Sequence, residues 1–459
     1  MTRRHFLGSA AALAQDQARP PNIVFLYTDD QARWSVGAYG NKDSRTPNMD
    51  RLASEGALFE RAFVSTPVCS PARAALLTSQ PSFRTGIRDF IDVRREPGLG
   101  LPVSFPTWPQ LLQDRGYRTG LFGKWHLGTR PEHHPTRRGY HEFFGFLEGG
   151  NTPMDPFLEV DGQSRRVNGS LPDLLADSCI DFLRRHRNGP LLASVHFRAP
   201  HGPYGPVPEA DSTALNGVTP STPDVKGLDR KWASSSLLAY YRSVASVDRN
   251  IGRILAALEQ FDLHRNTIVI FTSDHGYMIG HHGASGKGNA TAAPGAGTGR
   301  RPNLYDDSMR TPLIIRWPGV VRPGRRIAQM VSHLDFFPTL AGIAGAPVPH
   351  NYLPCGYDFA PLLRGQNIPW RDTLYGDYDM YHYYEDSMRM IRTSRWKLVT
   401  HSSREVQHEF FDLQEDPGET RNLIGSPEHA ANMRALRRRL YDWQVWMGDP
   451  RRRSPDEEM

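Results

Sequence analysis

A cysteine motif is the most chemically distinctive feature of the sequence. It lies within TPVCSPARAALLT (66–78), where Cys69 is followed at fixed spacing by Pro71 and Arg73. Proline suits the first turn of a helix, where its missing N–H costs no hydrogen bond, so Cys69 should lie just ahead of a helix N-terminus. Free N–H groups and the macrodipole favour an anion there, and Arg73 adds a forked donor that matches sulfate or phosphate oxygens. Taken alone, the motif also fits a buried cysteine ahead of an ordinary helix.

Aspartates end two long apolar runs. PNIVFLYTDD stops at Asp29 and Asp30, and NTIVIFTSDHG reaches Asp274 with His275 beside it. Apolar runs of this length are typical of strands that are buried on both faces of a parallel sheet. Adjacent carboxylates at a buried edge repel each other, and a divalent cation such as calcium or magnesium removes the repulsion. A helix N-cap next to a solvated aspartate is the alternative for Asp29 and Asp30.

Basic side chains follow two further predicted strands. Residues 107–128 are predicted to form a helix, a glycine turn and a strand that ends at Lys124 and His126. PLLASVHFRAPHGPY is predicted to be a strand that breaks at His201, which prolines and a glycine hold on a rigid turn. These positions favour a pocket for an anion. A solvated face is the alternative for Lys124, and His196 inside the strand is expected in the core.

Helices alternate with strands along most of the chain. Apolar spacing predicts helices over 46–63, 171–187, 235–263 and 333–345, and a further strand over 312–317. Residues 281–303 are rich in glycine and alanine and are predicted to be a flexible loop. The alternation predicts an α/β fold with a mostly parallel sheet.

The pattern changes at about residue 370. Short strand-like segments follow, and residues 429–447 are predicted to form a terminal helix. We therefore expect a catalytic domain over 21–368 and a smaller C-terminal domain over 369–459, with a short antiparallel sheet and one terminal helix.

The composition describes a globular chain of 459 residues, 39% of them apolar and 23% charged, with a mean hydropathy of −0.53. No apolar run is long enough to cross a bilayer, so we expect no stable membrane insertion. The net charge is +6, but most basic residues are scattered, and nucleic acid is not an expected partner.

Residues 1–20 are predicted to be an export signal and leader. MTRRHFLGSAAALA contains twin arginines, a short apolar region and a cleavage-like Ala-Leu-Ala, which is typical of a bacterial twin-arginine signal. Export would place the protein in the periplasm or outside the cell. Cys179 lies in a predicted helix and fits a small buried thiol, with a disulfide to Cys355 as the alternative.

The charged residues at the predicted strand ends should meet at one place. In doubly wound sheets, ligands bind outside the carboxyl ends of the strands. The acids suit a divalent cation, and the arginine, lysines and histidines suit an anion and its leaving group. Together they indicate cleavage of a sulfate or phosphate ester.

These motifs resemble the type I, formylglycine-dependent sulfatase family within the alkaline-phosphatase-like superfamily. Between about residues 21 and 425 the resemblance is carried by CSPARAALLT with SFRTG, YTDD, GKWHLG, APHGPY, TSDHG, LYDDSMRTPLIIRWPG and FDLQEDPGETRNL. It implies a large, mostly parallel sheet sandwiched by helices, plus the smaller C-terminal domain. The implied activity is hydrolysis of sulfate esters, with sulfated carbohydrate as the expected substrate class.

The resemblance also implies that a maturation enzyme oxidises Cys69 to formylglycine. One hydroxyl of the hydrated aldehyde would attack sulfur, and the second, with His126 as the base, would expel the sulfate; a thiol has no second hydroxyl. The leaving alcohol would be protonated by His201 or a nearby lysine, and Arg73 would orient the nucleophile.

By family position, one calcium ion would be held by Asp29, Asp30, Asp274, His275 and the formylglycine at position 69. Many members carry asparagine where this chain has His275, and imidazole is a softer ligand than calcium prefers.

Lys124 and Lys287 match the sulfate-binding lysines of the family. A glycine- and alanine-rich insertion separates Lys287 from Tyr305, so the reach of Lys287 is an open question.

Two other functions fit the same residues. One is a phosphonate or phosphate ester hydrolase on the same scaffold, and the other is a catalytically inactive protein that binds sulfated glycans. Candidate sugar contacts, each of which also fits an ordinary surface residue, are Arg88, Asp89, His141, His281 and His282.

Overall fold

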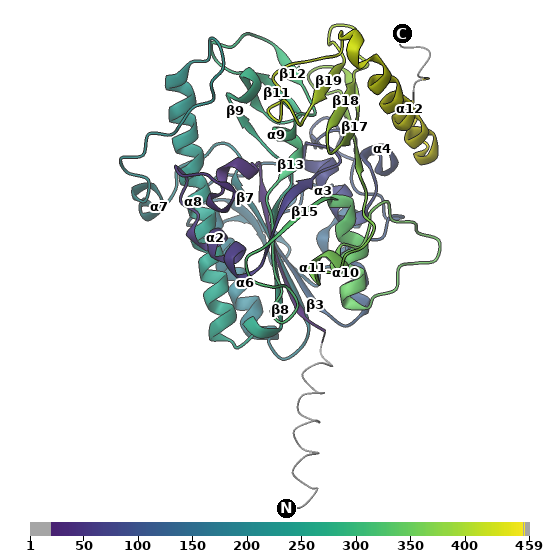
Figure 1. The fold of residues 1–459 in the computed structure, drawn as a ribbon. Coiled ribbons are helices and arrows are strands. Elements are labelled where there is room, and N and C mark those ends of the chain that lie inside the picture. Colours follow the sequence, from purple (N-terminus) through teal and green to yellow (C-terminus); the bar gives the residue numbers. More distant parts are fainter. Residues whose placement is uncertain (1–19, 453, 455–459) are drawn as a thin grey trace, which may run out of the picture.

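A large mixed β-sheet with helices on both faces forms the centre of the molecule, and a smaller sheet with a terminal helix packs beside it (Figure 1). The structure is a computed structural model that describes residues 20–452 and 454. The predicted export signal, up to residue 19, lies outside the described residues. Among those that are described, no helix has the length and apolar character that a bilayer crossing requires.

Five neighbouring strands in the middle of the large sheet are parallel. In spatial order they are β8 (Thr267–Ser273), β1 (Asn22–Asp29), β7 (Leu191–Pro200), β3 (Arg118–Lys124) and β4 (Glu142–Phe146). Every residue of β1 and β8 is buried, as their apolar runs predict. Alternate side chains of β1 enter two separate cores, with Phe25 on one face and Leu26 on the other.

The flanking strands make the sheet mixed. Beyond β8 lie β14 (Leu313–Arg316), β2 (Ala57–Phe63), β13 (Arg310–Thr311) and β15 (Arg325–Ser332), and beyond β4 lie β5 (Phe157–Val160) and β6 (Gln163–Arg166). The predicted strand over 312–317 is present as β14, but it runs antiparallel to β8. No long crossover helix returns the chain to the other end of the sheet between these two strands, and a parallel pairing needs one.

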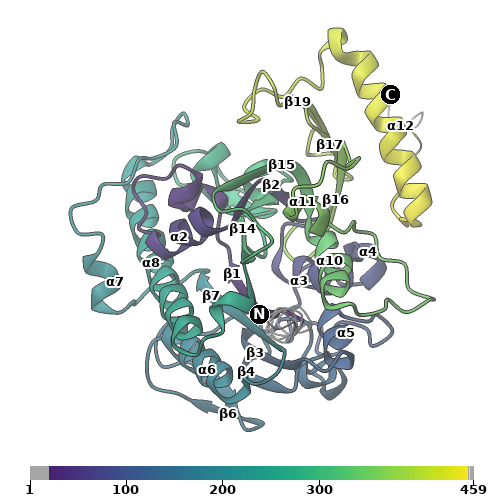
Figure 2. The same cartoon turned by 60° about the horizontal axis from the view of Figure 1, so that its bottom comes forward.

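Helices cover both faces of the large sheet (Figures 1 and 2). One face packs against α3 (Cys69–Thr78), α5 (Trp108–Asp114), α10 (Phe336–Ala344) and α11 (Ala360–Leu363), and the other against α2 (Pro47–Glu55), α6 (Leu171–His186) and α8 (Arg230–Gln260). The predicted helices over 171–187, 235–263 and 333–345 are therefore confirmed. Short helices are α4 (Ser82–Thr85), α7 (Glu209–Thr213) and α9 (Asp306–Met309).

The predicted helix over 46–63 is wrong in its second half. The helix α2 ends at Glu55, and after Gly56 the chain continues as β2. A Cβ at Gly56 would lie 2.4 Å from the backbone oxygen of Ile315, so this close approach requires glycine. From there the side chains alternate with a period of two, Leu58 facing one core and Phe59 the other.

The predicted flexible loop over 281–303 is a small antiparallel sheet. Its strands are β9 (Met278–Ile279), β10 (Ala284–Gly286), β11 (Asn289–Ala292) and β12 (Arg300–Pro302). The small residues allow close packing: Met278, Ala284 and Ala290 share a core, and a Cβ at Gly288 would lie 2.8 Å from the Pro67 ring. Lys287 is consequently held on the tight turn between β10 and β11.

The C-terminal part has the predicted antiparallel sheet and terminal helix, namely β16 (Thr373–Met380), β17 (Asp386–Thr393), β18 (Trp396–Thr400), β19 (Glu409–Asp412) and α12 (Ala430–Met447). Buried ion pairs join it to α9, which leads into β13 of the large sheet, because Asp306 accepts hydrogen bonds from Arg392 at 2.8 Å and from Lys397 at 3.1 Å. The domain boundary at 368/369 stays a prediction. Cys179 and Cys355 are both free thiols.

A buried histidine in the C-terminal sheet should make stability depend on pH. The Nδ1 atom of His401 lies 2.6 Å from Asp386 Oδ2, and Glu409 Oε2 lies 3.5 Å from Nε2. Burial opposes the imidazolium, but the two carboxylates outweigh it and raise the pKa of His401 to about 9. A raised pKa stabilises the folded state below the ordinary value near 6.5, and this contribution is lost as the pH rises toward 9.

We expect the free energy of unfolding of the wild type to fall between pH 6.5 and 9.5 by on the order of 3 kcal/mol more than that of His401→Gln. Urea denaturation of both proteins at the two pH values measures the difference. Equal pH dependence in the two proteins would contradict the assignment.

Candidate active site

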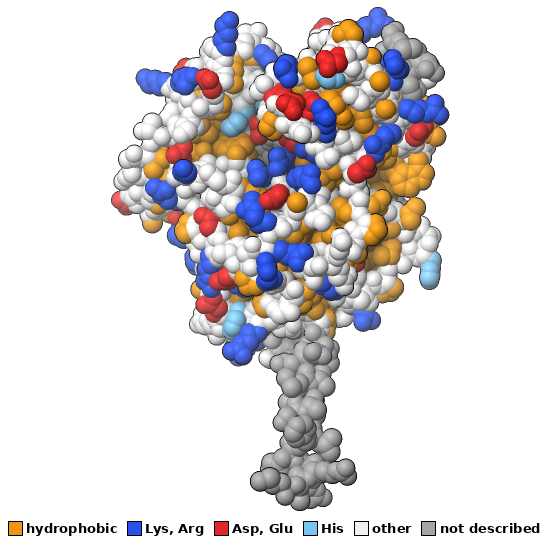
Figure 3. Space-filling model, viewed as in Figure 1, with side chains coloured by type: hydrophobic (Ala, Val, Ile, Leu, Met, Phe, Trp, Pro, Cys, Tyr) orange, Lys and Arg blue, Asp and Glu red, His pale blue; other side chains and the backbone are white. Residues whose placement is uncertain are grey.

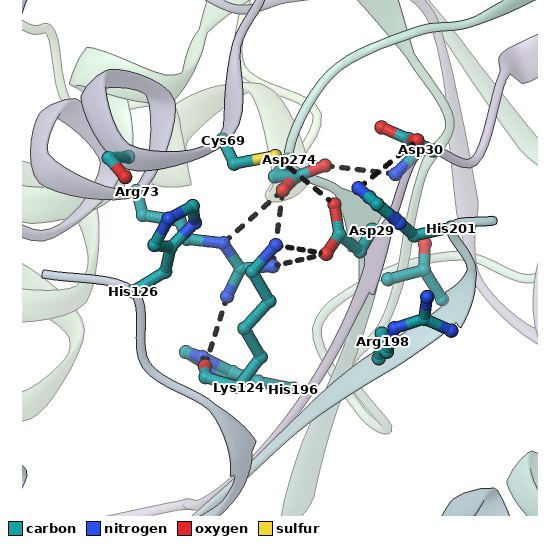
Figure 4. A network of polar contacts seen from close by, with 12 residues as sticks. Asp29, Asp30, Cys69, Arg73, Lys124, His126, His196, Arg198, His201 and Asp274 are labelled. Atoms are coloured by element: carbon teal, nitrogen blue, oxygen red, sulfur yellow. Dashed lines mark hydrogen bonds and ion pairs between the residues drawn. The ribbon is translucent and has the colours of Figure 1, made fainter. Parts of the chain in front are cut away.

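Charged side chains gather at the carboxyl ends of four neighbouring parallel strands (Figure 4). Asp29 ends β1 and Lys124 ends β3, while His201 follows β7 and Asp274 follows β8. Asp30 and His126 have left-handed backbones, with φ of 63° and 61°, which turn the chain sharply as it leaves each strand. The charged residues that the sequence predicts at the ends of these strands therefore do meet at one place.

Cys69 is the first residue of α3 and lies inside this cluster. Its Sγ atom is 3.5 Å from Asp29 Oδ1, 3.6 Å from His275 Nε2 and 3.0 Å from the Lys287 ammonium. Burial and Asp29 raise the pKa of the thiol, but Lys124, Lys287 and His126 outweigh them, so the pKa lies well below its ordinary value. The reach of Lys287, which the sequence left open, is thus sufficient to contact position 69.

Arg73, one turn further along α3, makes hydrogen bonds to other members of this cluster. Its Nε and Nη2 atoms donate to Asp274 Oδ2 at 3.2 and 3.1 Å, and Nη1 donates to the Lys124 carbonyl at 3.0 Å. The guanidinium also stacks over the ring of Tyr27 at 5.1 Å. Burial opposes its charge, but Asp274 and Asp29 hold the pKa above the ordinary value. With every nitrogen engaged, Arg73 positions the strand ends.

Two lysines pair with two of the aspartates. Lys124 Nζ donates to Asp29 Oδ2, and Lys287 Nζ donates to Asp30 Oδ1, both at 2.5 Å. Burial favours the neutral carboxyl of Asp29, but Lys124 outweighs it and lowers the pKa well below the ordinary value. Burial also opposes charge on Lys287, but Asp30 outweighs it and raises the lysine pKa. Both lysines line the cavity above Cys69.

The carboxylates and His275 form a donor set that fits a metal ion. Ligand atoms of Asp29, Asp30, Cys69 and His201 lie within 4.8 Å of one another, as do those of Asp29, Cys69, Asp274 and His275. Atoms this close can all surround one ion at about 2.4 Å, the distance of calcium–oxygen bonds. Burial and Asp29 raise the pKa of Asp274 to about 7, a sign of the mutual repulsion that a cation relieves.

The hydrogen bond of His275 directs its free ring nitrogen into this donor set. Its Nδ1 atom lies 2.9 Å from the Gly276 carbonyl, which can only accept, so Nδ1 carries the proton. The Nε2 atom then faces Asp274 Oδ1 at 3.3 Å and Asp30 Oδ1 at 3.4 Å. When the ring is neutral, the lone pair on Nε2 faces two carboxylate oxygens and is repelled by them. A cation bound among the three atoms would remove this repulsion.

The other two histidines, His126 and His201, line the cavity above Cys69. His126 Nε2 lies 3.0 Å from the Ile91 carbonyl and His201 Nδ1 lies 2.8 Å from the Gly202 carbonyl, so these nitrogens are the donors. His126 Nδ1 has no hydrogen bond among the described residues, and its ring is close enough to Cys69 to alter the thiol pKa. Burial lowers the pKa of both histidines. His196 is a core residue, as expected.

A cavity of about 630 Å³ opens above Cys69. Its walls come from residues that the sequence did not single out, namely the segment 90–95, Glu148 to Gly150, Asn289 and Tyr383. None of the five candidate sugar contacts lines it. Asp89, for example, is buried and accepts a hydrogen bond from Tyr378 at 2.8 Å, and Arg88 pairs with Asp379.

The other three candidate sugar contacts also have structural partners. His141 contacts Thr119 at 2.9 Å, His281 stacks on Trp34 with ring centroids 4.7 Å apart, and His282 lies 3.3 Å from Asp307. None of the five lines the cavity above Cys69, so the alternative, an ordinary structural or surface residue, is the better supported for each. The residues that do line the wall carry no shared motif, since they come from loops and one strand in separate parts of the chain.

Comparison with known proteins shows the family. The family model for sulfatases matches residues 21–346, and a model described as N-sulphoglucosamine sulphohydrolase, C-terminal, matches residues 300–445. N-acetylglucosamine-6-O-sulfatase of Bacteroides thetaiotaomicron is 28% identical, over 98% of this chain and 90% of its own length. Arylsulfatase A of Homo sapiens is 32% identical, over 92% and 87%.

A solved structure shares the whole fold. It is a protein in complex with its substrate D-glucosamine-2-N,6-O-disulfate, with a TM-score of 0.82 and 26% identity over 96% of this chain and 100% of the other. The matched family, the full-length relatives and the shared architecture agree: the chain belongs to the sulfatase family of sulfuric ester hydrolases, with an alkaline-phosphatase-like fold.

Proposed function

We propose that this sulfatase releases sulfate from sulfated carbohydrate, with a formylglycine made from Cys69 as its nucleophile and one calcium ion as its cofactor. The observation that carries the proposal is the position of Cys69, at a helix N-terminus between two lysines and three carboxylates. An anion drawn to the lysines would lie directly over position 69.

Calcium is the metal that the donor set favours. Asp29, Asp30 and Asp274 provide hard oxygen ligands, and His275 presents Nε2 from a ring fixed by the Gly276 carbonyl. When bound, calcium supplies positive charge that stabilises the oxygen of the nucleophile and the charge that develops on the sulfate. The ammonium groups of Lys124 and Lys287 stabilise the same developing charge.

Lys124 and Lys287 are assigned to sulfate binding, because both ammonium groups line the cavity beside Cys69. Arg73 orients the nucleophile by fixing Asp274 and the end of β3. His126 is assigned as the base, since its free Nδ1 can accept a proton. Burial keeps His201 neutral at pH 7, so a lysine is the better supported donor for the leaving alcohol.

Sulfated amino sugars are the proposed substrates. A relative is named for 6-O-desulfation of N-acetylglucosamine, and a structural neighbour holds a glucosamine disulfate as its substrate. The cavity volume of about 630 Å³ suits a molecule of sugar size. Export through the twin-arginine segment and conversion of Cys69 by a maturation enzyme complete the proposal.

Replacing Cys69 should abolish catalysis while leaving the fold intact. We expect Cys69→Ala to lose sulfate release from 4-nitrophenyl sulfate and from N-acetylglucosamine 6-sulfate, and Cys355→Ala, with its half-buried thiol outside the cavity, to keep it. Peptide mass spectrometry should find formylglycine at position 69 after expression with a maturation enzyme. Full activity of Cys69→Ala, or faster turnover of matching phosphate esters by the wild type, would contradict the proposal.

The metal ligands should differ in how replacement affects calcium dependence. After chelation, Asp30→Ala should need roughly tenfold or more calcium for half-maximal activity, because an oxygen ligand is lost. His275→Asn should need no more calcium than the wild type, because an amide oxygen is a harder ligand than imidazole. Titration of activity against free calcium measures both. A magnesium requirement that calcium cannot meet would refute the metal assignment.

The pH profile should report His126. A base must be neutral to act, and burial lowers the pKa of His126 from 6.5. Because His126 acts after the alcohol has left, kcat should rise through a pKa below 6.5 and stay level to pH 8. His126→Ala should lower kcat by roughly 10²- to 10⁴-fold. A decrease in wild-type activity as the pH rises from 5.5 to 7, with no such decrease in His201→Gln, would make His201 the proton donor to the leaving alcohol. That result would contradict the assignment of a lysine to this role.

A further inference from the structure

A second depression lies next to the Cys69 cavity, along one edge of the large sheet. It has a volume of about 510 Å³, and its floor is formed by β4, β5 and β6 with the loop 147–152; we call it the β4–β6 groove. Glu148 and Gly150 line both the groove and the Cys69 cavity. The two spaces therefore share a wall, and a ligand longer than one ring could occupy both.

An exposed aromatic residue forms part of the groove floor. Phe157 is the first residue of β5 and is 61% exposed, whereas the next residue, Leu158, is fully buried in the core. Strand alternation puts Phe157 and Glu159 on the outer face. Phe157 therefore presents an apolar ring to the groove, beside the polar side chains that line it.

The backbone around Phe157 is fixed before any ligand binds. Asn151 Nδ2 donates to the Phe157 carbonyl at 2.7 Å, and the Phe157 N–H donates to Asn151 Oδ1 at 3.2 Å. Pairing of β5 with β6 holds the same residue from the other side, opposite Arg166. The ring is therefore carried on a rigid support, which lowers the entropy lost when a ligand stacks on it.

The polar atoms of the groove suit hydroxyl groups. Thr129, Asn151, Thr152 and Ser164 line it, and Glu148 and Glu159 are its charged groups. Carboxylates accept hydrogen bonds from sugar hydroxyls but repel sulfate, and Glu159 is also paired with His134 at 3.0 Å. The Cys69 cavity contains Asp92 and Glu148 as well, but there the lysines with Arg94 and Arg95 outnumber the acids. Charge thus separates the two spaces: the cavity takes the anionic ring and the groove takes an uncharged one.

We propose that the β4–β6 groove binds the uncharged sugar ring next to the sulfated ring, with Phe157 stacked on its C–H face. The enzyme then acts on sulfated oligosaccharides in preference to sulfated monosaccharides. This inference rests on the proposed sulfatase activity toward carbohydrate and names the form of the substrate.

Chain length and Phe157 test the proposal together. The probes are 4-nitrophenyl sulfate, N-acetylglucosamine 6-sulfate, and the two disaccharides in which galactose is attached on either side of that sulfated ring. At least one disaccharide should be turned over with kcat/KM roughly five- to tenfold above the monosaccharide, and Phe157→Ala should remove this gain. Phe157→Tyr should keep it, and Trp446→Ala, which truncates another exposed aromatic ring on α12, should change nothing.

Charge provides a second test. Glu148→Gln should raise kcat/KM for a disaccharide whose galactose carries its own sulfate by roughly threefold relative to the disaccharides whose galactose is unsulfated. Two outcomes would overturn this inference but not the proposed sulfatase activity. One is equal kcat/KM for the monosaccharide and both disaccharides; the other is hydrolysis of 4-nitrophenyl sulfate with no turnover of any of the three saccharides. Failure to hydrolyse 4-nitrophenyl sulfate as well would overturn the proposed function and the inference with it.

Discussion

The mutual repulsion of three buried aspartates is the constraint on which the site depends. Asp29, Asp30 and Asp274 are almost fully withdrawn from water, and unbalanced charges there would destabilise the fold by several kcal/mol each. Lys124 and Lys287 each neutralise one aspartate, and Arg73 binds a third while also holding the end of β3. Because each cation has a defined partner, removing any one leaves a buried charge without compensation.

The sheet makes this concentration of charge sustainable. The aspartates are carried by adjacent parallel strands whose side chains enter packed cores on both faces, so the strand ends have little freedom to move apart. Tyr240 of α8 adds support, because its hydroxyl donates to the Asp30 carbonyl at 2.7 Å and accepts from the Ala32 N–H at 2.9 Å. The left-handed turn at Asp30 is thereby held in place.

The sequence predicted the parts of the fold that depend on apolar periodicity. The runs before Asp29 and Asp274 identified two buried strands and placed the acids at their ends, since parallel strands bring their carboxyl ends to one edge. The segment 46–63 was misread because its apolar residues satisfy both helical and strand spacing, and only contact of Gly56 with Ile315 separates the two. No single-sequence pattern reports a contact between residues so far apart in the chain.

The glycine-rich segment that carries Lys287 illustrates a second limit. Glycine and alanine are typical of mobile loops, but here they permit close packing against Pro67 and within the small core around Met278. The same composition can therefore support opposite dynamics, depending on whether a neighbouring surface lies within contact distance. This packing makes Lys287 a fixed cation rather than a mobile one.

The residues that surround the substrate cavity were the least predictable. On the face of Figure 3, lysine and arginine side chains mix with acidic and apolar ones. The substrate cavity likewise combines basic and acidic side chains, among them Lys124, Arg95 and Glu148. Its wall combines Tyr383 from the C-terminal part with Glu148 from beyond β4, and Arg95 stacks over Tyr383 at 5.3 Å. Chemistry is thus fixed by strand ends that share one sheet, whereas substrate choice depends on loops that can change without disturbing those strands. The two functions can vary separately because the buried aspartates, and not the cavity wall, carry the electrostatic balance of the site.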